Sequence, residues 1–123
     1  MRARGPTISI AVEGVDTLER GEVRIAPLPR PKQGPPREAL VLRDHAGELR
    51  VYLNRCQHLP IPLDGGSRRF LSADGSHLEC GTHGALYRLD NGHCVDGPCE
   101  GESLERIAFT VEGATVKLVV DEE

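Results

Sequence analysis

Two short motifs in the sequence combine side chains that bind transition metals. Cys56-Gln57-His58 has the form C-x-H, Cys80-Gly81-Thr82-His83 has the form C-x-x-H, and 21 residues separate them. Each motif offers one thiolate and one imidazole. Zinc fingers usually pair Cys with Cys and His with His. One Cys and one His from each of two loops suit a cluster of two irons, in which one iron takes both cysteines and the other takes both histidines.

The same four residues allow two other interpretations. A single structural zinc ion could take all four side chains. A disulfide between Cys56 and Cys80 is disfavoured in a reducing compartment, and it leaves both motif histidines unexplained. The other histidines, His45, His77 and His93, have no cysteine at ligand spacing. We expect these three to be surface or packing residues.

The sequence around both motifs resembles the Rieske [2Fe–2S] family. The segment from Cys56 to Leu63 is similar to the first cluster loop of that family, and Cys80 to Tyr87 is similar to the second, with a turn at Gly92 after it. Gly97-Pro98-Cys99 and the strands between Leu104 and Val120 are similar to stand-alone bacterial members. The resemblance covers about residues 20–120, which is nearly the whole chain.

The resemblance implies an all-β fold: an antiparallel Rieske-type sandwich or partial barrel with a small cluster-binding subdomain. It implies one [2Fe–2S] cluster per chain, with Cys56, His58, Cys80 and His83 as its ligands. It further implies a ferredoxin-like one-electron carrier, not an enzyme, whose redox partner protein is a reductase, an oxygenase or both. The alternatives are a dedicated small or regulatory redox subunit of one enzyme complex and a zinc-stabilised interaction domain.

The loops depart from the respiratory branch of that family. Where that branch has the two cysteines of a loop disulfide, this chain has Ile61 and Thr82, and where it has a serine that donates to a cluster sulfur, this chain has Ala85. Tyr87 matches a tyrosine that donates to a cysteine sulfur, with a packing role as the alternative. Because donors to sulfur raise the potential, we expect a midpoint in the lower part of a span of roughly −150 to +300 mV.

Short antiparallel strands must position these loops. Apolar residues alternate with period two over 7–12, 22–25 and 49–53. A turn at 44–47 predicts a hairpin between 39–42 and 49–53, and a turn at 112–114 predicts a second hairpin between 106–111 and 115–120. Further tight turns are predicted at Asp74-Gly75 and Asp90-Asn91-Gly92, and one helical turn is predicted from Val15 to Arg20, stopped by Gly21.

We expect one domain in which residues 1–55 and 104–123 form a β base and residues 56–103 form the cluster-binding segment. The five prolines of Pro27–Pro36 predict an exposed, stiff loop, with a plain connector between strands as the other interpretation. Cys94 and Cys99 flank a tight loop, where we expect two buried thiols, and a disulfide is the alternative.

Charge and hydropathy exclude several classes of protein. The net charge of −4 argues against nucleic acid as a partner, and no run approaches the roughly 20 apolar residues of a membrane span. Basic residues at the start are followed by Gly5 and Pro6, where a signal peptide needs an apolar run, so we expect a cytoplasmic protein. The segment 56–103 has seven acidic and three basic residues and carries all the excess charge. It predicts either an electrostatic docking surface or a solvated loop face.

Overall fold

The computed structural model describes residues 7–29, 37–55, 69–80, 84–97 and 101–121, and over these ranges the chain is built from β-strands. The elements in chain order are β1 (Thr7–Glu13), the 3-10 turn η1 (Val15–Thr17), β2 (Val23–Pro27), β3 (Glu38–Arg43), β4 (Leu49–Leu53), β5 (His77–Glu79), β6 (Leu86–Arg88), β7 (Cys94–Asp96), β8 (Ala108–Glu112) and β9 (Thr115–Asp121).

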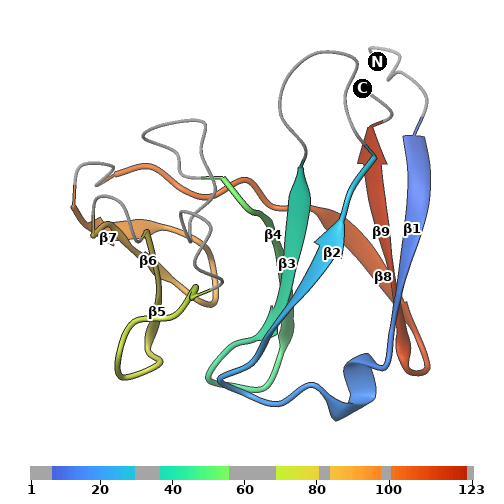
Figure 1. Ribbon diagram of the computed structural model, residues 1–123, viewed down its shortest axis with the longest axis horizontal. Coiled ribbons are helices and arrows are strands. Elements are labelled where there is room, and N and C mark those ends of the chain that lie inside the picture. The colour runs from blue at the N-terminus through green and yellow to red at the C-terminus, as the bar shows by residue number, and fades with distance from the viewer. Residues whose placement is uncertain (1–6, 30–36, 56–68, 81–83, 98–100, 122–123) are drawn as a thin grey trace.

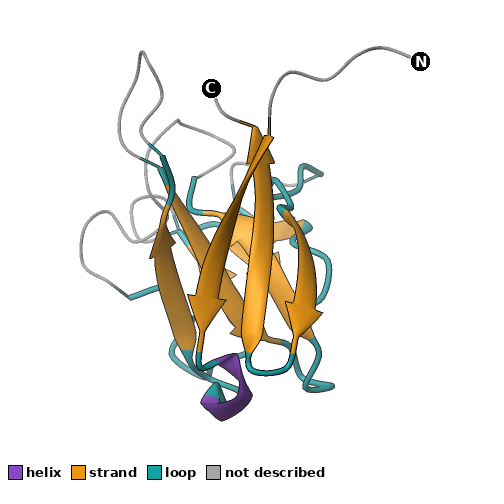
Figure 2. Ribbon diagram, turned by 90° about the vertical axis from the view of Figure 1, so that its right-hand side faces the viewer, coloured by secondary structure: helices purple, strands orange, loops and turns teal. Residues whose placement is uncertain are grey.

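The strands form three antiparallel three-stranded sheets, which lie side by side in Figure 1. We call β1-β9-β8 the outer sheet, β2-β3-β4 the central sheet and β5-β6-β7 the small sheet. Figure 2 shows the outer sheet in front, with η1 at the lower end of the strands. The antiparallel all-β prediction is therefore confirmed.

Two apolar cores fill the spaces on the two sides of the central sheet. The outer-sheet core contains Val12, Val15, Leu18, Ala26, Leu28, Ala39, Val41, Val51, Leu53, Ile107, Val116, Leu118 and Val120. The small-sheet core contains Leu40, Leu42, Tyr52, Phe70, Leu78, Cys80, Ala85, Tyr87, Leu89, Cys94 and Leu104. Strand β3 contributes to both, because successive side chains of a strand point to opposite faces. Its run of apolar residues without polar alternation follows from burial on both faces.

Both predicted hairpins are present, but the second one begins later than predicted. Strands β3 and β4 pair from Ala39↔Leu53 to Arg43↔Leu49, and β8 and β9 pair around the turn at Gly113. Residues 106 and 107, the first part of the second predicted hairpin, lie instead with residue 105 along the edge of β4. The amide of Leu53 donates to the carbonyl of Glu105 at 2.9 Å, and that of Ile107 donates to Val51 at 3.1 Å. This switch from one sheet to another joins the central and outer sheets.

The predicted helical turn from Val15 to Arg20 is wrong in length. It ends at Thr17 as a 3-10 turn, and Leu18 is already extended, so Gly21 does not stop it. The Arg43 guanidinium explains the early end. It donates to the carbonyl of Leu18 at 2.7 Å and to that of Val15 at 2.9 Å, and so bonds carbonyls at the end of the short turn.

The predicted loop from Pro27 to Pro36 begins later than expected. Pro27 is the last residue of β2 and pairs with Glu38, and Leu28 is buried with its amide donating to the Arg37 carbonyl at 2.9 Å. The pairing continues because Leu28 belongs to the outer-sheet core. The predicted turns at Asp74-Gly75 and Asp90-Asn91-Gly92 are both present. Of the residues the structure describes, none belongs to a helix that could cross a membrane.

Candidate metal centre

Cys80 is the one motif residue within the described ranges, and it lies at the end of β5. It is fully buried in the small-sheet core. Its amide donates to the carbonyl of Ala85 at 2.8 Å, and the amide of Gly84 donates to the carbonyl of Cys80 at 2.7 Å. These two bonds join Cys80, the first residue of the C-x-x-H motif, to the two residues that follow the motif. Gly84 has φ +72°, a left-handed conformation that glycine adopts readily.

The other motif residues, Cys56, His58 and His83, lie outside the described residues, as do Ile61, Thr82 and Cys99. The strand that leads to the first motif is well defined. Strand β4 ends at Leu53, and the amide of Asn54 donates to the carbonyl of Glu38 at 2.8 Å while its side-chain amide donates to the Glu38 carboxylate at 3.1 Å. The last residues before Cys56 are thus bonded to the start of β3.

Residues that follow the second motif are buried and closely packed. Ala85 and Tyr87 are fully buried, and Gly97 lies against Ala85. A Cβ atom added to Gly97 would come within 2.6 Å of the Ala85 Cα, so only glycine fits there without a shift. In the sequence, Gly97 belongs to a segment that resembles stand-alone bacterial members of the family, but the sequence does not reveal its contact with Ala85.

Cys94 is the second cysteine of the small-sheet core. It is almost fully buried, and its thiol donates to the carbonyl of Asp96 at 3.2 Å. Its amide donates to the carbonyl of Glu102 at 2.7 Å, which draws the residues on both sides of the loop together. The burial predicted for Cys94 is present. That Cys94 and Cys99 are two thiols and not a disulfide stays a prediction, because Cys99 lies outside the described residues.

The three remaining histidines bond to serine residues. The Nε2 atom of His45 lies 3.1 Å from the Ser76 carbonyl, the Nδ1 of His77 lies 2.8 Å from the Ser76 hydroxyl, and the Nδ1 of His93 lies 3.1 Å from the Ser103 hydroxyl. Within the described ranges, no three His, Cys, Asp or Glu side chains group in a way that could hold a metal ion.

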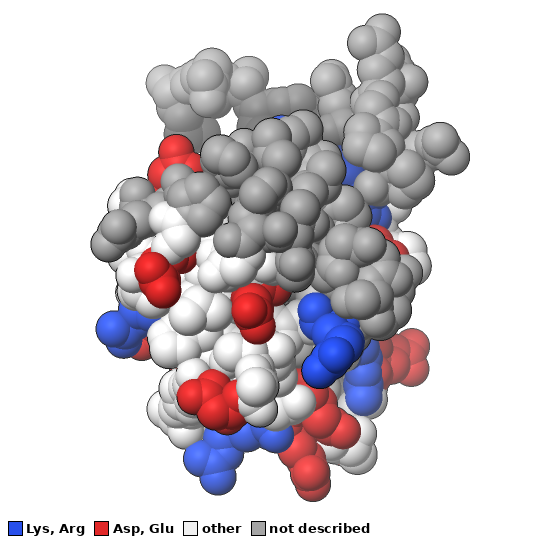
Figure 3. Space-filling model, turned by 60° about the vertical axis from the view of Figure 1, so that its left-hand side comes forward, with Lys and Arg blue, Asp and Glu red and all other residues white. Residues whose placement is uncertain are grey.

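Carboxylates in the turns beside the small sheet are held ionised. Side-chain and backbone hydrogen bonds from Ser76, with a further one from Ser72, keep the pKa of Asp74 well below its usual value. A two-point contact from the Arg88 guanidinium lowers the pKa of Asp90 to about 2. On the described surface in Figure 3, acidic side chains lie both in the middle and along the edges, and basic side chains lie beside them at the left, the bottom and the right.

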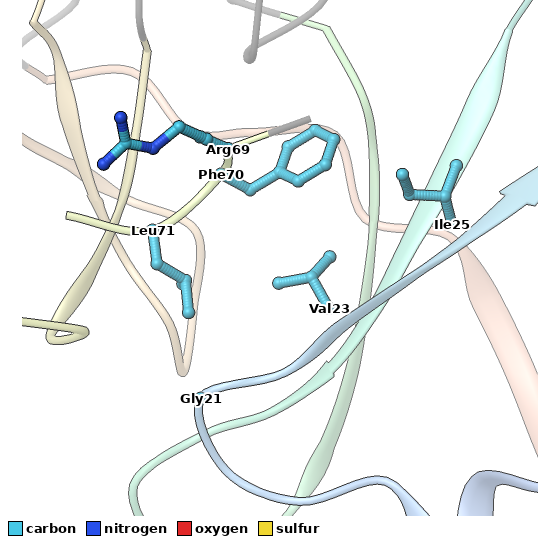
Figure 4. Close-up of a pocket in the computed structure, with 6 residues that line it drawn as sticks. All are labelled: Gly21, Val23, Ile25, Arg69, Phe70 and Leu71. Atoms are coloured by element: carbon cyan, nitrogen blue, oxygen red, sulfur yellow. The ribbon is translucent and has the colours of Figure 1, made fainter. Parts of the chain in front are cut away.

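A cavity of about 290 Å³ opens between the central sheet and the chain that follows the first motif. Val23 and Ile25 of β2 point toward Phe70 and Leu71 across it, and Gly21 and Arg69 complete its lining (Figure 4). None of these side chains is a thiol, an imidazole or a carboxylate. The cavity therefore does not supply metal ligands.

A comparison with protein-family models identifies one family. A model of the Rieske [2Fe-2S] domain family matches residues 11–118. Among the curated proteins, none matches this chain closely enough to count as a relative.

Solved structures show the same fold at low identity. The ferredoxin of carbazole 1,9a-dioxygenase from Nocardioides aromaticivorans IC177 is 22% identical, with a TM-score of 0.61 over 92% of this chain and 97% of that one. The terminal oxygenase of the same system is also 22% identical, with a TM-score of 0.68 over 94% of this chain and 30% of that one. A putative NADH-dependent nitrite reductase small subunit from Mycobacterium tuberculosis is 14% identical, with a TM-score of 0.59 over 93% and 96%. The chain spans about a third or less of the oxygenase chains that it matches.

Proposed function

This chain belongs to the Rieske [2Fe–2S] domain family, and we therefore propose that it is a one-electron carrier for a redox partner protein. The observation that carries the proposal is the family match over residues 11–118, which includes both metal-binding motifs. A domain of this family holds one [2Fe–2S] cluster. The proposed ligands are Cys56, His58, Cys80 and His83.

The surroundings of Cys80 fit such a cluster. A thiolate taken out of water needs a compensating charge or bond, and an iron atom provides both. Cys80 is fully buried, it starts a loop whose ends are bonded, and it packs among apolar side chains that keep water away. When bound, the cluster accepts and releases one electron. The chain's own residues hold it, shield it and set its potential.

The proposed division of the chain follows the sheets. Residues 1–55 and 104–123 form the base, and residues 56–103 form the cluster-binding segment. The small sheet supports this division, because β5, β6 and β7 all lie within 56–103 and form a sheet of their own.

The proposed partner is a reductase, an oxygenase or both. A ferredoxin of an oxygenase system has this fold over nearly its full length, which supports the proposal. We place the docking surface around the second motif, where Asp96 and Glu102 are exposed near Gly97. Exposed carboxylates there favour a partner with a basic docking face. We also propose a reducing, cytoplasmic location, in which thiols such as those expected at Cys94 and Cys99 stay reduced.

Substitution of the histidines tests the ligand assignment. We expect His58→Ala and His83→Ala to abolish the visible absorption of the purified protein and to reduce its iron and sulfide content severalfold. His45→Ala, His77→Ala and His93→Ala are the matched controls, because their rings bond to serine residues. They should leave two irons and two sulfides per chain. Equal loss of iron in both groups would contradict the assignment.

A reductive titration tests the proposed activity. Each chain should take up one electron in a single reversible step, and the reduced protein should pass it on to an acceptor protein. A colourless protein with one zinc ion per chain, after anaerobic purification, would instead support a zinc-stabilised interaction domain.

A further inference from the structure

Tyr52 links the strand before the first motif to the turn after the second motif. Its side chain is buried on β4, four residues before Cys56. Its hydroxyl donates to the carbonyl of Leu89 at 2.7 Å, and Leu89 directly follows β6. One buried hydrogen bond thus joins the central sheet to the small sheet.

The turn that receives this bond fits closely over the tyrosine ring. A Cβ atom added to Gly92 would come within 2.8 Å of the Tyr52 Cε1 atom and within 3.4 Å of the Leu104 Cβ. The amide of Gly92 donates to the carbonyl of Arg88, and the amide of Leu104 donates to that of Gly92. The turn is therefore fixed against the ring from several sides.

Each end of the link leads to one cluster motif. On the central sheet, β4 is held along its edge by residues 105–107 and continues into the first motif. On the small sheet, β6 pairs with β5, and the amide of Cys80 bonds to Ala85, one residue before β6. The spacing of the two motifs therefore depends on how the central and small sheets sit against each other.

Other hydrogen bonds also cross this boundary. The amide of Leu104 donates to the Gly92 carbonyl at 2.8 Å, and two side-chain bonds run from His45 to the Ser76 carbonyl at 3.1 Å and from Arg106 to the Asn91 carbonyl at 3.5 Å. Both of these side-chain bonds are exposed. Exposed bonds compete with water and constrain less than a buried one. Burial also raises the pKa of Tyr52 to about 12, so its hydroxyl stays protonated and able to donate at neutral pH.

We propose that Tyr52 is a positioning residue that fixes the spacing of the two cluster motifs through its hydrogen bond to Leu89. This inference rests on the proposed function, because it assumes that the two motifs bind one cluster. Phenylalanine at this position fills the same space but leaves the Leu89 carbonyl without its donor.

The test compares Tyr52→Phe with Val41→Ala, which weakens the outer-sheet core on the far side of the central sheet. The readouts are the rate of iron release to a chelator without denaturant and the EPR linewidths of the reduced protein. Tyr52→Phe should release iron about two- to tenfold faster, which corresponds to one intramolecular hydrogen bond, and its EPR lines should broaden. Val41→Ala should change neither the rate of iron release nor the EPR linewidths, even if it lowers the thermal stability as much as Tyr52→Phe does.

A glycine pair provides a second test from the other side of the contact. Gly92→Ala presses on the tyrosine ring, whereas Gly113→Ala meets nothing within 4 Å, and both positions have positive φ, at +72° and +61°. Gly92→Ala should reproduce the faster release and the broader lines, and Gly113→Ala should not.

The outcomes separate this inference from the proposed function. If the wild-type protein holds the cluster but both variants behave as their controls do, the role of Tyr52 is refuted and the carrier function stands. If the wild-type protein holds no cluster, the proposed carrier function and the proposed role of Tyr52 are both refuted.

Discussion

Gly97 shows how a single residue can support the second motif. Its backbone lies so close to Ala85 that an added methyl group would come within 2.6 Å of the Ala85 Cα. We expect Gly97→Ala to lower the free energy of unfolding by about 2 kcal/mol or more and to reduce the iron content, since backbone atoms cannot move aside as a flexible side chain can. Chemical denaturation and iron analysis measure these effects.

Gly101→Ala is the matched control for this change. Its φ of +94° is close to the +100° of Gly97, so the backbone strain is similar, but nothing lies within 4 Å of its added Cβ. If both variants lose the same stability, the contact with Ala85 is unimportant and only the backbone conformation matters.

Substitutions at Ala85 and Tyr87 should change the midpoint potential of the cluster. Both are fully buried in the core that contains Cys80. Ala85→Ser adds a donor beside the motif and should raise the midpoint potential, because donors to sulfur stabilise the more negative, reduced cluster. Tyr87→Phe should lower it. Voltammetry measures both shifts.

The wild-type midpoint should lie below about 0 mV in a family span of roughly −150 to +300 mV. An unchanged potential in Tyr87→Phe would mean that the tyrosine only packs. A wild-type value near the top of the span would contradict the low potential expected from Ala85 and from the absent loop disulfide.

At the scale of elements, the β3–β4 turn depends on one buried carboxylate. Asp44 accepts hydrogen bonds from the amides of Ala46 at 2.9 Å and Glu48 at 3.0 Å and from the Arg50 guanidinium at 2.9 Å. Burial alone raises its pKa, but the bonds from Glu48, Arg50 and Ala46 outweigh burial and hold the pKa of Asp44 below its usual value. The folded state therefore prefers the ionised carboxylate.

Asp44→Asn should cost about 1–3 kcal/mol of unfolding free energy at pH 7, since it weakens a buried set of charge-assisted bonds. Because the folded pKa lies below the unfolded one, the stabilising effect is complete above about pH 4 and is lost as the pH falls through the folded pKa. Denaturation at several pH values should show the difference between wild type and variant shrinking below about pH 4. A constant difference would exclude the carboxylate's charge as its cause.

For the whole molecule, the acidic surface predicts how the carrier meets its partner. Charge steering raises association rates and is screened by salt over a Debye length of about 8 Å at physiological ionic strength. Electron transfer to the partner, followed by stopped flow, should slow as salt increases. Charge reversal by Asp96→Lys or Glu102→Lys should slow it further at low salt.

Glu13→Lys is the control for charge reversal, because Glu13 is exposed at the end of β1 in the outer sheet. It changes the net charge equally but lies away from the small sheet. A rate that does not depend on salt would leave the acidic residues as solvated side chains and would favour a permanently bound subunit over a diffusing carrier.

Much of the fold could be predicted from the sequence, because the signals for its strands and turns lie in neighbouring residues. Alternating apolar residues and glycine turns located both hairpins, and the run Ala39–Leu42 already signalled a strand. The length of η1 could not be predicted, because it depends on Arg43, more than twenty residues away. Residues 105–107 could not be assigned to the edge of β4 for the same reason.

The candidate metal centre also has features that could be predicted from the sequence and features that could not. Its ligand types and spacing are local, so the four candidate ligands could be named from the two motifs. The contact of Gly97 with Ala85 and the bond from Tyr52 to Leu89 join residues 12 and 37 positions apart. Such contacts arise only when the sheets pack, and a single sequence does not reveal them.

The most direct test of the central claim is the EPR spectrum of the dithionite-reduced protein at low temperature. Two cysteines on one iron and two histidines on the other should give a rhombic signal with a low average g value, integrating to one unpaired electron per chain. Replacing His58 or His83 should remove that signal, whereas replacing His93 should not. A spectrum with the higher average g value of an all-cysteine cluster, or no signal from protein that contains two irons, would contradict the mixed-ligand centre.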